Sequence, residues 1–98
     1  MPLNYLIFDA SDDGEGTGTW EAMASVRAAD LPAVRAEAQA VLAVAERRAP
    51  GPRGPLAAGG VWDAAVQQHT DGDWTTVTLT LTGPWVWGEA LVEDVGGH

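Results

Sequence analysis

Residues 61–82 read VWDAAVQQHTDGDWTTVTLTLT, and this stretch decides the fold. Two arms with alternating apolar and polar residues flank the pair Asp71-Gly72, and such alternation indicates half-buried strands. Asp-Gly between alternating arms favours a tight hairpin, because Asp tolerates and Gly favours the positive φ angles of a type I′ turn. The stretch therefore predicts an antiparallel hairpin in which an Asp71-Gly72 turn pairs Thr70 with Asp73.

The side chains of the two arms agree with this pairing. One face becomes apolar, and its cross-strand pairs are Val66 with Val77, Ala64 with Leu79 and Trp62 with Leu81. The other face becomes polar, and its pairs are Ala65 with Thr78, Gln67 with Thr76, Asp63 with Thr80 and His69 with Trp74. A slip of one residue would set the apolar face of one arm against the polar face of the other, so we expect this register.

Two more strands and one long helix are predicted before this hairpin. Residues 4–11 (NYLIFDAS) form a short apolar run, and residues 17–26 (TGTWEAMASV) alternate, with the turn-forming sequence DDGEG between them. Residues 31–48 place apolar side chains at the spacing of one helix face, and Pro50 ends the pattern. These segments predict a first hairpin followed by an amphipathic helix.

The segment after the second hairpin is less regular. Residues 84–95 read PWVWGEALVEDV, in which Trp85 and Trp87 alternate with Val86. This alternation predicts a fifth strand, and an irregular segment with a short helical turn is the alternative.

The order of these elements predicts a single α+β domain over residues 1–98. Two β-hairpins flank one long amphipathic helix (ββαββ, with a fifth C-terminal strand), and the helix packs on one face of an antiparallel or mixed sheet. Residues 49–60 are expected to form a Pro/Gly-rich loop, and residues 96–98 a loose tail.

Composition excludes several classes of protein. The chain has 98 residues, no cysteine and a net charge of −9, and its five basic residues all lie between Arg27 and Arg53. Disulfides and thiolate chemistry are therefore absent, and nucleic acid is not an expected partner, because a polyanion requires several clustered cations. No run approaches a membrane span or a signal peptide, so we expect no membrane association and a cytoplasmic location. Abundant alanine without lysine suggests a bacterial source.

The acidic stretch Asp9 to Glu15 begins like a calcium-binding loop. Asp9, Ser11, Asp13 and Gly14 occupy the first positions of such a loop, but Trp20 stands where a bidentate glutamate is needed. A solvated turn is therefore the favoured interpretation, and a divalent-cation site is a minor alternative. No metal or cofactor is predicted.

Five residues are candidates for a binding site. Trp74 and His69 lie on the predicted polar face, where an aromatic side chain and a group that titrates near neutrality could contact a partner. Trp85 and Trp87 belong either to the core or to the wall of a pocket, and Arg53 could hold an anionic group beside the Pro/Gly loop. No catalytic residue is predicted, because neither His69 nor the serines lie within a recognisable catalytic motif.

These features favour a small, acidic, non-catalytic protein-interaction domain that could associate with a second copy of itself. The unpaired sheet face and the strand edges motivate this hypothesis. The first alternative is a small-molecule-binding protein with a Trp-lined pocket. A divalent-cation-binding loop or an enzyme that uses His69 is the third.

Overall fold

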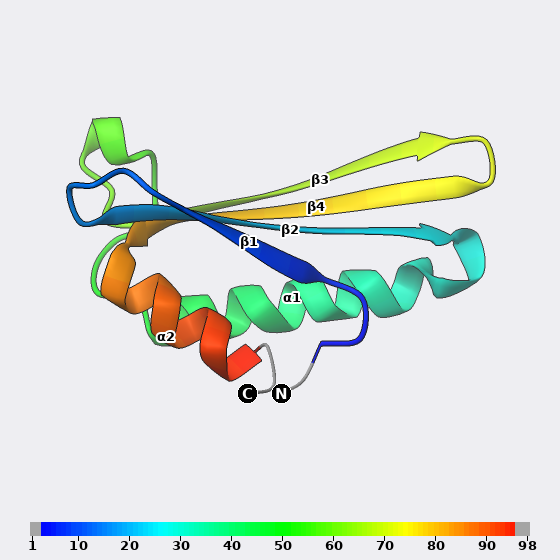
Figure 1. Ribbon diagram of the computed structural model, residues 1–98, viewed down its shortest axis with the longest axis horizontal. Helices are drawn as coiled ribbons and strands as arrows, with labels where there is room; N and C mark the ends of the chain where they lie inside the picture. Colours follow the sequence, from blue (N-terminus) through cyan, green and yellow to red (C-terminus); the bar gives the residue numbers. More distant parts are fainter. Residues whose placement is uncertain (1–2, 96–98) are drawn as a thin grey trace.

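The structure is a computed structural model that describes residues 3–95. In chain order its elements are β1 (Ile7–Asp12), β2 (Thr17–Arg27), the 3₁₀ turn η1 (Ala28–Asp30), α1 (Leu31–Arg47), the 3₁₀ turn η2 (Leu56–Ala58), β3 (Asp63–Asp71), β4 (Trp74–Pro84) and α2 (Trp85–Val95). Figure 1 shows both α-helices on the same side of the sheet. The fold is therefore α+β, with one long helix packed against an antiparallel sheet, as predicted.

The sheet has four strands in the order β1-β2-β4-β3, and all neighbours are antiparallel. The inner arms of the two hairpins, β2 and β4, form the central pair. Their outer arms, β1 and β3, form the two edges. Both helices cover the same face, and no layer formed by residues 3–95 covers the other face of the sheet (Figure 1).

The core lies between the sheet and the two helices. Alternate side chains of β2 and β4 point into it, as the sequence pattern predicted for both strands. The helices contribute side chains spaced one turn apart. Its fully buried members include Trp20, Ala22, Val34, Ala38, Val41, Ala45, Trp62, Val77, Leu79, Leu81 and Leu91.

The second hairpin differs from the prediction by a shift of two residues. Asp71 pairs with Trp74, so the turn has Gly72 and Asp73 at its centre. Gly72 has a φ of +60°, and no non-glycine residue among those described has a positive φ. A type I′ turn would need positive φ at two consecutive residues, whereas Gly at the first central position is typical of type II′. The predicted pairs are wrong, but the predicted faces are confirmed, because a shift of two preserves side-chain alternation.

The predicted fifth strand is wrong, because Trp85–Val95 is the helix α2. Its buried residues, Trp87, Gly88, Leu91 and Val95, follow helical rather than strand spacing. The Trp-Val-Trp alternation covers only three residues, and the helix-forming sequence after Gly88 continues for two turns. α2 packs on β2 and β4, with Trp87 against Trp20 and Gly83.

The segment before β1 is held by one side chain of α1. Glu37 accepts hydrogen bonds from the backbone N–H groups of Asn4, Tyr5 and Leu6 at 2.8, 3.1 and 3.1 Å. The predicted loop 49–60 connects α1 to β3 and contains η2. The predicted tail 96–98 lies outside the described residues, and within residues 3–95 neither helix is both long and apolar enough to cross a membrane.

Candidate binding surface

The uncovered face of the sheet, called here the open face, carries the side chains that alternate with the core residues. Arg27 and Trp74 pair across β2 and β4 at one end of it. Its members include Ile7, Asp9 and Ser11 of β1, Thr19, Glu21, Met23, Ser25 and Arg27 of β2, Trp74, Thr76, Thr78, Thr80 and Thr82 of β4, and Asp63, Ala65, Gln67, His69 and Asp71 of β3.

A threonine row runs along the middle of the open face on β4. The four threonines Thr76, Thr78, Thr80 and Thr82 are half-buried by their neighbours on β2 and β3. Thr76 shares a 2.7 Å hydrogen bond between its hydroxyl and that of Ser25. Such short, β-branched side chains form a flat surface with methyl and hydroxyl groups that a partner could contact closely.

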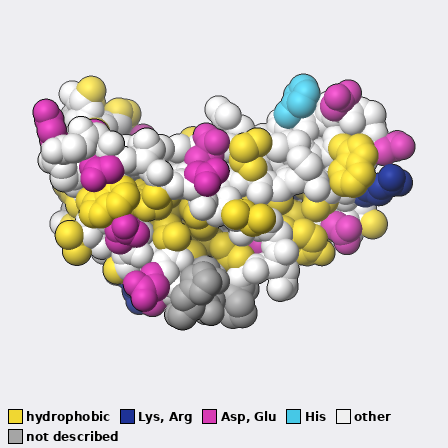
Figure 2. Space-filling view, viewed as in Figure 1, with side chains coloured by type: hydrophobic (Ala, Val, Ile, Leu, Met, Phe, Trp, Pro, Cys, Tyr) yellow, Lys and Arg dark blue, Asp and Glu magenta, His cyan; other side chains and the backbone are white. Residues whose placement is uncertain are grey.

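Large apolar side chains lie beside this row. Ile7 is 77% exposed, and Met23 and Trp74 are each 49% exposed. Single exposed apolar groups are ordinary on protein surfaces, but these three share one sheet face. Figure 2 views the molecule from the edge of the sheet, and on that side apolar patches lie among acidic groups, with few basic groups.

Trp74 and His69 lie on the open face but do not form the predicted cross-strand pair. His69 lies opposite Thr76, and Trp74 lies opposite Asp71 on one side and Arg27 on the other. The guanidinium carbon of Arg27 stands 5.1 Å from the centre of the Trp74 ring, within cation–π range. An open hollow of 460 Å³ is lined by Gln67, Gln68, His69, Thr76 and Thr78, and Trp74 does not line it.

Trp85 and Trp87 pack against other tryptophans. Trp85 stacks on Trp20 with ring centres 5.3 Å apart, while Trp87 contacts Trp20 edge-on at 6.2 Å and Trp62 at 5.5 Å. Trp87 is only 8% exposed. The contacts therefore support the core interpretation of these residues, and the Trp-lined pocket remains a prediction.

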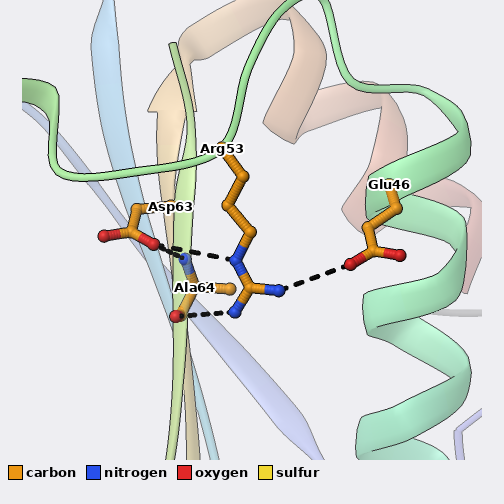
Figure 3. A network of polar contacts seen from close by, with 4 residues as sticks. All are labelled: Glu46, Arg53, Asp63 and Ala64. Atoms are coloured by element: carbon orange, nitrogen blue, oxygen red, sulfur yellow. Dashed lines mark hydrogen bonds and ion pairs between the residues drawn. The ribbon is translucent and has the colours of Figure 1, made fainter. Parts of the chain in front are cut away.

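Arg53 joins α1 to the start of β3, as Figure 3 shows. Its guanidinium lies 3.3 Å from the Glu46 carboxylate, donates a 3.2 Å hydrogen bond to the Ala64 carbonyl and lies 3.8 Å from the Asp63 carboxylate. It also lies over the ring of Trp62 at 5.3 Å. These contacts occupy the guanidinium, so the anion-binding role predicted for Arg53 gains no support from them.

The acidic loop between β1 and β2 uses its carboxylates within the turn. Asp12 accepts a 2.8 Å hydrogen bond from the N–H of Gly14, and Asp13 accepts from the N–H groups of Glu15 and Thr17 at 2.7 and 3.1 Å. This is the bonding of a solvated Asx-type turn. Across residues 3–95, no three His, Asp or Glu side chains gather closely enough to hold a metal ion.

His69 has no partner that would make it a catalytic base. Within the described part of the chain it makes no hydrogen bond or ion pair with a serine or a carboxylate, and the hydroxyl of Ser25 pairs with Thr76 instead. His98, the other histidine, lies outside the described residues. The contacts of His69 within residues 3–95 therefore add no support to the enzyme hypothesis.

Sequence reasoning missed the residues that fix the ends of the sheet. Neither the triple contact of Glu37 nor the link from Arg53 to Ala64 has a sequence signature, because each joins segments far apart in the chain. Comparisons with protein-family models, with curated proteins and with solved structures found no match. The geometry of the open face is therefore the basis for a functional proposal.

Proposed function

We propose that this protein is a non-catalytic interaction domain that binds another protein through its open face. The observation that carries this proposal is the one-sided covering of the sheet, which leaves Met23, Trp74 and the threonine row exposed together. At about 3.3 Å per residue and ~4.8 Å between strands, this face spans roughly 600 Å². That area approaches the ~800 Å² per partner of a standard protein interface.

Charge restricts the chemistry of the partner. The open face carries four acids against the single cation Arg27, and the whole chain carries −9; the acids are Asp9, Glu21, Asp63 and Asp71. A partner surface with Lys or Arg around an apolar centre complements this pattern, and opposite charges accelerate the encounter. A second copy stacked face to face would instead bring like charges together.

The test uses a protein captured by the tagged wild type from its host and then purified. Calorimetry should show at least ~10-fold weaker binding for Trp74→Ala, because half-exposed tryptophans are typical interface hot spots. Val86→Ala is the matched control, since Val86 is 81% exposed on α2 and lies off the open face. Equal binding by Trp74→Ala and wild type, or weaker binding by Val86→Ala alone, would contradict the proposal.

A further inference from the structure

The free edge of β3 exposes main-chain groups in a regular pattern. The carbonyls of Trp62 and Ala64 accept hydrogen bonds from the Gly54 N–H and from Arg53, which both lie on the side away from β4. In an antiparallel strand the main-chain groups of alternate residues point to the same side. The N–H and C=O groups of Val66, Gln68 and Thr70 therefore also point outward at this edge.

The start of this edge is already occupied, whereas the rest is free. Residues 52–54 run beside Trp62, the Ala64 carbonyl is bonded to Arg53, and the Ala64 N–H is bonded to the Asp63 carboxylate at 2.8 Å. No hydrogen bond from the described residues reaches the outward main-chain groups beyond this point. The free edge consequently runs over residues 65–71, and Gln68 is its midpoint.

Most of this free edge lacks the features with which proteins prevent strands from pairing. Residues 65–70 contain no lysine, arginine, acid or proline, so that Asp71 at the hairpin tip is its one charged residue, and the register with β4 is continuous, without a bulge. Edge strands are ordinarily protected by such charges, prolines or bulges. The opposite edge, β1, carries Asp9 and Asp12 within six residues.

We propose that β3 pairs with β3 of a second copy, antiparallel and centred on Gln68. A two-fold axis through the Gln68 pair sets Val66 against Thr70 of the second copy, and Gln67 against His69. The backbone N–H and C=O groups of three residues in each chain then bond across the axis, which gives about six main-chain hydrogen bonds; the residues are Val66, Gln68 and Thr70. The interface is isologous, as in most homodimers.

The ends of the free edge match in length. In this register the hairpin tip of one copy, with Asp71 and Asp73, ends beside Ala64 of the other. That is where residues 52–54 begin to cover the edge and where Arg53 lies. Arg53 is already paired there with Glu46 and Asp63 of its own chain, so charge adds nothing to the fit. A second copy fits the free edge by its length, because the stretch that pairs in each copy is the stretch that its own chain leaves uncovered.

Pairing through β3 keeps the helices of both copies on one side, because the two-fold axis is perpendicular to the sheet. The two open faces then join into one surface of eight strands. The inference concerns the edge of β3 and not the open face, so it can fail or hold independently of the proposed function.

The experiment combines light scattering and hydrogen exchange on the full chain, from about 1 µM to about 1 mM, because a short interface implies weak association. The mass should rise with concentration from 10.2 kDa to twice that value. The amides of Val66, Gln68 and Thr70 should become at least ~10-fold slower to exchange at high concentration. The outward amides of β1 should not change.

Two variants test the interface, and one is a control. Gln68→Pro removes an N–H that β4 does not use, so the hairpin is kept while the central hydrogen bonds are lost. If circular dichroism shows that Gln68→Pro does not fold, the double variant Gln67→Glu with His69→Glu is used in its place. The double variant places acids opposite acids across the axis. Either folded variant should remain monomeric. Trp74→Ala, on the open face, should dimerise like the wild type.

Three results would overturn the inference. The first is a wild-type mass of 10.2 kDa at every concentration. This result would exclude the dimer even if a different protein slowed exchange at Val66, Gln68 and Thr70. The second is a dimer that persists in the folded edge variant. The third is a dimer that Trp74→Ala abolishes, because that result would place the contact on the open face.

Discussion

Gly88 of α2 lies directly against the indole of Trp20 on β2. A Cβ atom added at Gly88 would stand 2.1 Å from Cη2 of Trp20, which is far inside van der Waals contact. Trp20 is fully buried and cannot move aside, because Trp85 and Trp87 pack on its other sides. The absence of a side chain at Gly88 is what allows α2 to close over the sheet.

Gly88→Ala should therefore lower the free energy of unfolding by about 1–3 kcal/mol, the typical range for overpacked cores. Urea unfolding followed by tryptophan fluorescence measures the change. Glu89→Ala, at the exposed neighbouring position of α2, should change stability by less than about 0.5 kcal/mol. Comparable losses in the two variants, or a gain in stability from Gly88→Ala through its better helix propensity, would contradict the limiting role of the contact with Trp20.

Glu37→Gln should loosen the segment before β1. The amide side chain retains one acceptor oxygen, whereas the carboxylate serves three N–H groups with two oxygens. We expect a loss of about 1–3 kcal/mol in unfolding free energy and faster hydrogen exchange at Tyr5 and Leu6. Glu93→Gln, at an exposed position of α2, is the control. Unchanged exchange at Tyr5 and Leu6 would contradict the anchoring role.

Arg53→Ala should destabilise the junction between α1 and β3. The side chain is 42% exposed, so its ion pair with Glu46 is screened by water, and the hydrogen bond to the Ala64 carbonyl contributes more. A loss of about 1 kcal/mol is expected from thermal or urea unfolding. Arg47→Ala removes the same charge from the end of α1 and should cost less. An equal effect of both substitutions would indicate that net charge, rather than the contacts of Arg53, is responsible.

Gly72→Ala tests the turn of the second hairpin. Gly72 holds a φ of +60°, which an L-residue adopts only at a cost of about 1–2 kcal/mol. Asp73→Asn should be nearly neutral, because no positive φ is required there. Urea unfolding of both variants measures the change in stability, and backbone chemical shifts report the conformation of the turn. If Asp73→Asn were the more damaging change, the assignment of Gly72 and Asp73 to the turn centre would be wrong.

Local alternation was sufficient to predict most of the sheet. The alternation of Trp20, Ala22, Ala24 and Val26 identified the buried face of β2, and the same periodicity assigned the faces of β3 and β4. It did not determine their register, because shifts by two residues preserve every face. The observed register differs from the predicted one because of the backbone at Gly72, whose positive φ places the glycine at the first central position of the turn.

The end of the chain shows a different limit of sequence reasoning. The alternation at Trp85, Val86 and Trp87 fits a strand, but three residues are too few to exclude a helix. The helix forms because Gly88 and Leu91 then fall on the face that meets Trp20, a contact with a residue far away in the chain. Of the five predicted site residues, the structure places Trp74 and His69 on one exposed face. The other three lie in contacts with the rest of the protein.

The strand order has a consequence for how the chain reaches this structure. The central pair joins β2 to β4, whose nearest residues are separated by α1 and the whole of β3. Each hairpin can close locally within microseconds, but a lone two-stranded hairpin is marginally stable in water. Folding must therefore wait for the long-range meeting of β2 and β4, and such non-local contacts slow folding. Until β2 and β4 meet, both strand edges of each hairpin are unpaired. Association between chains competes with folding during this interval.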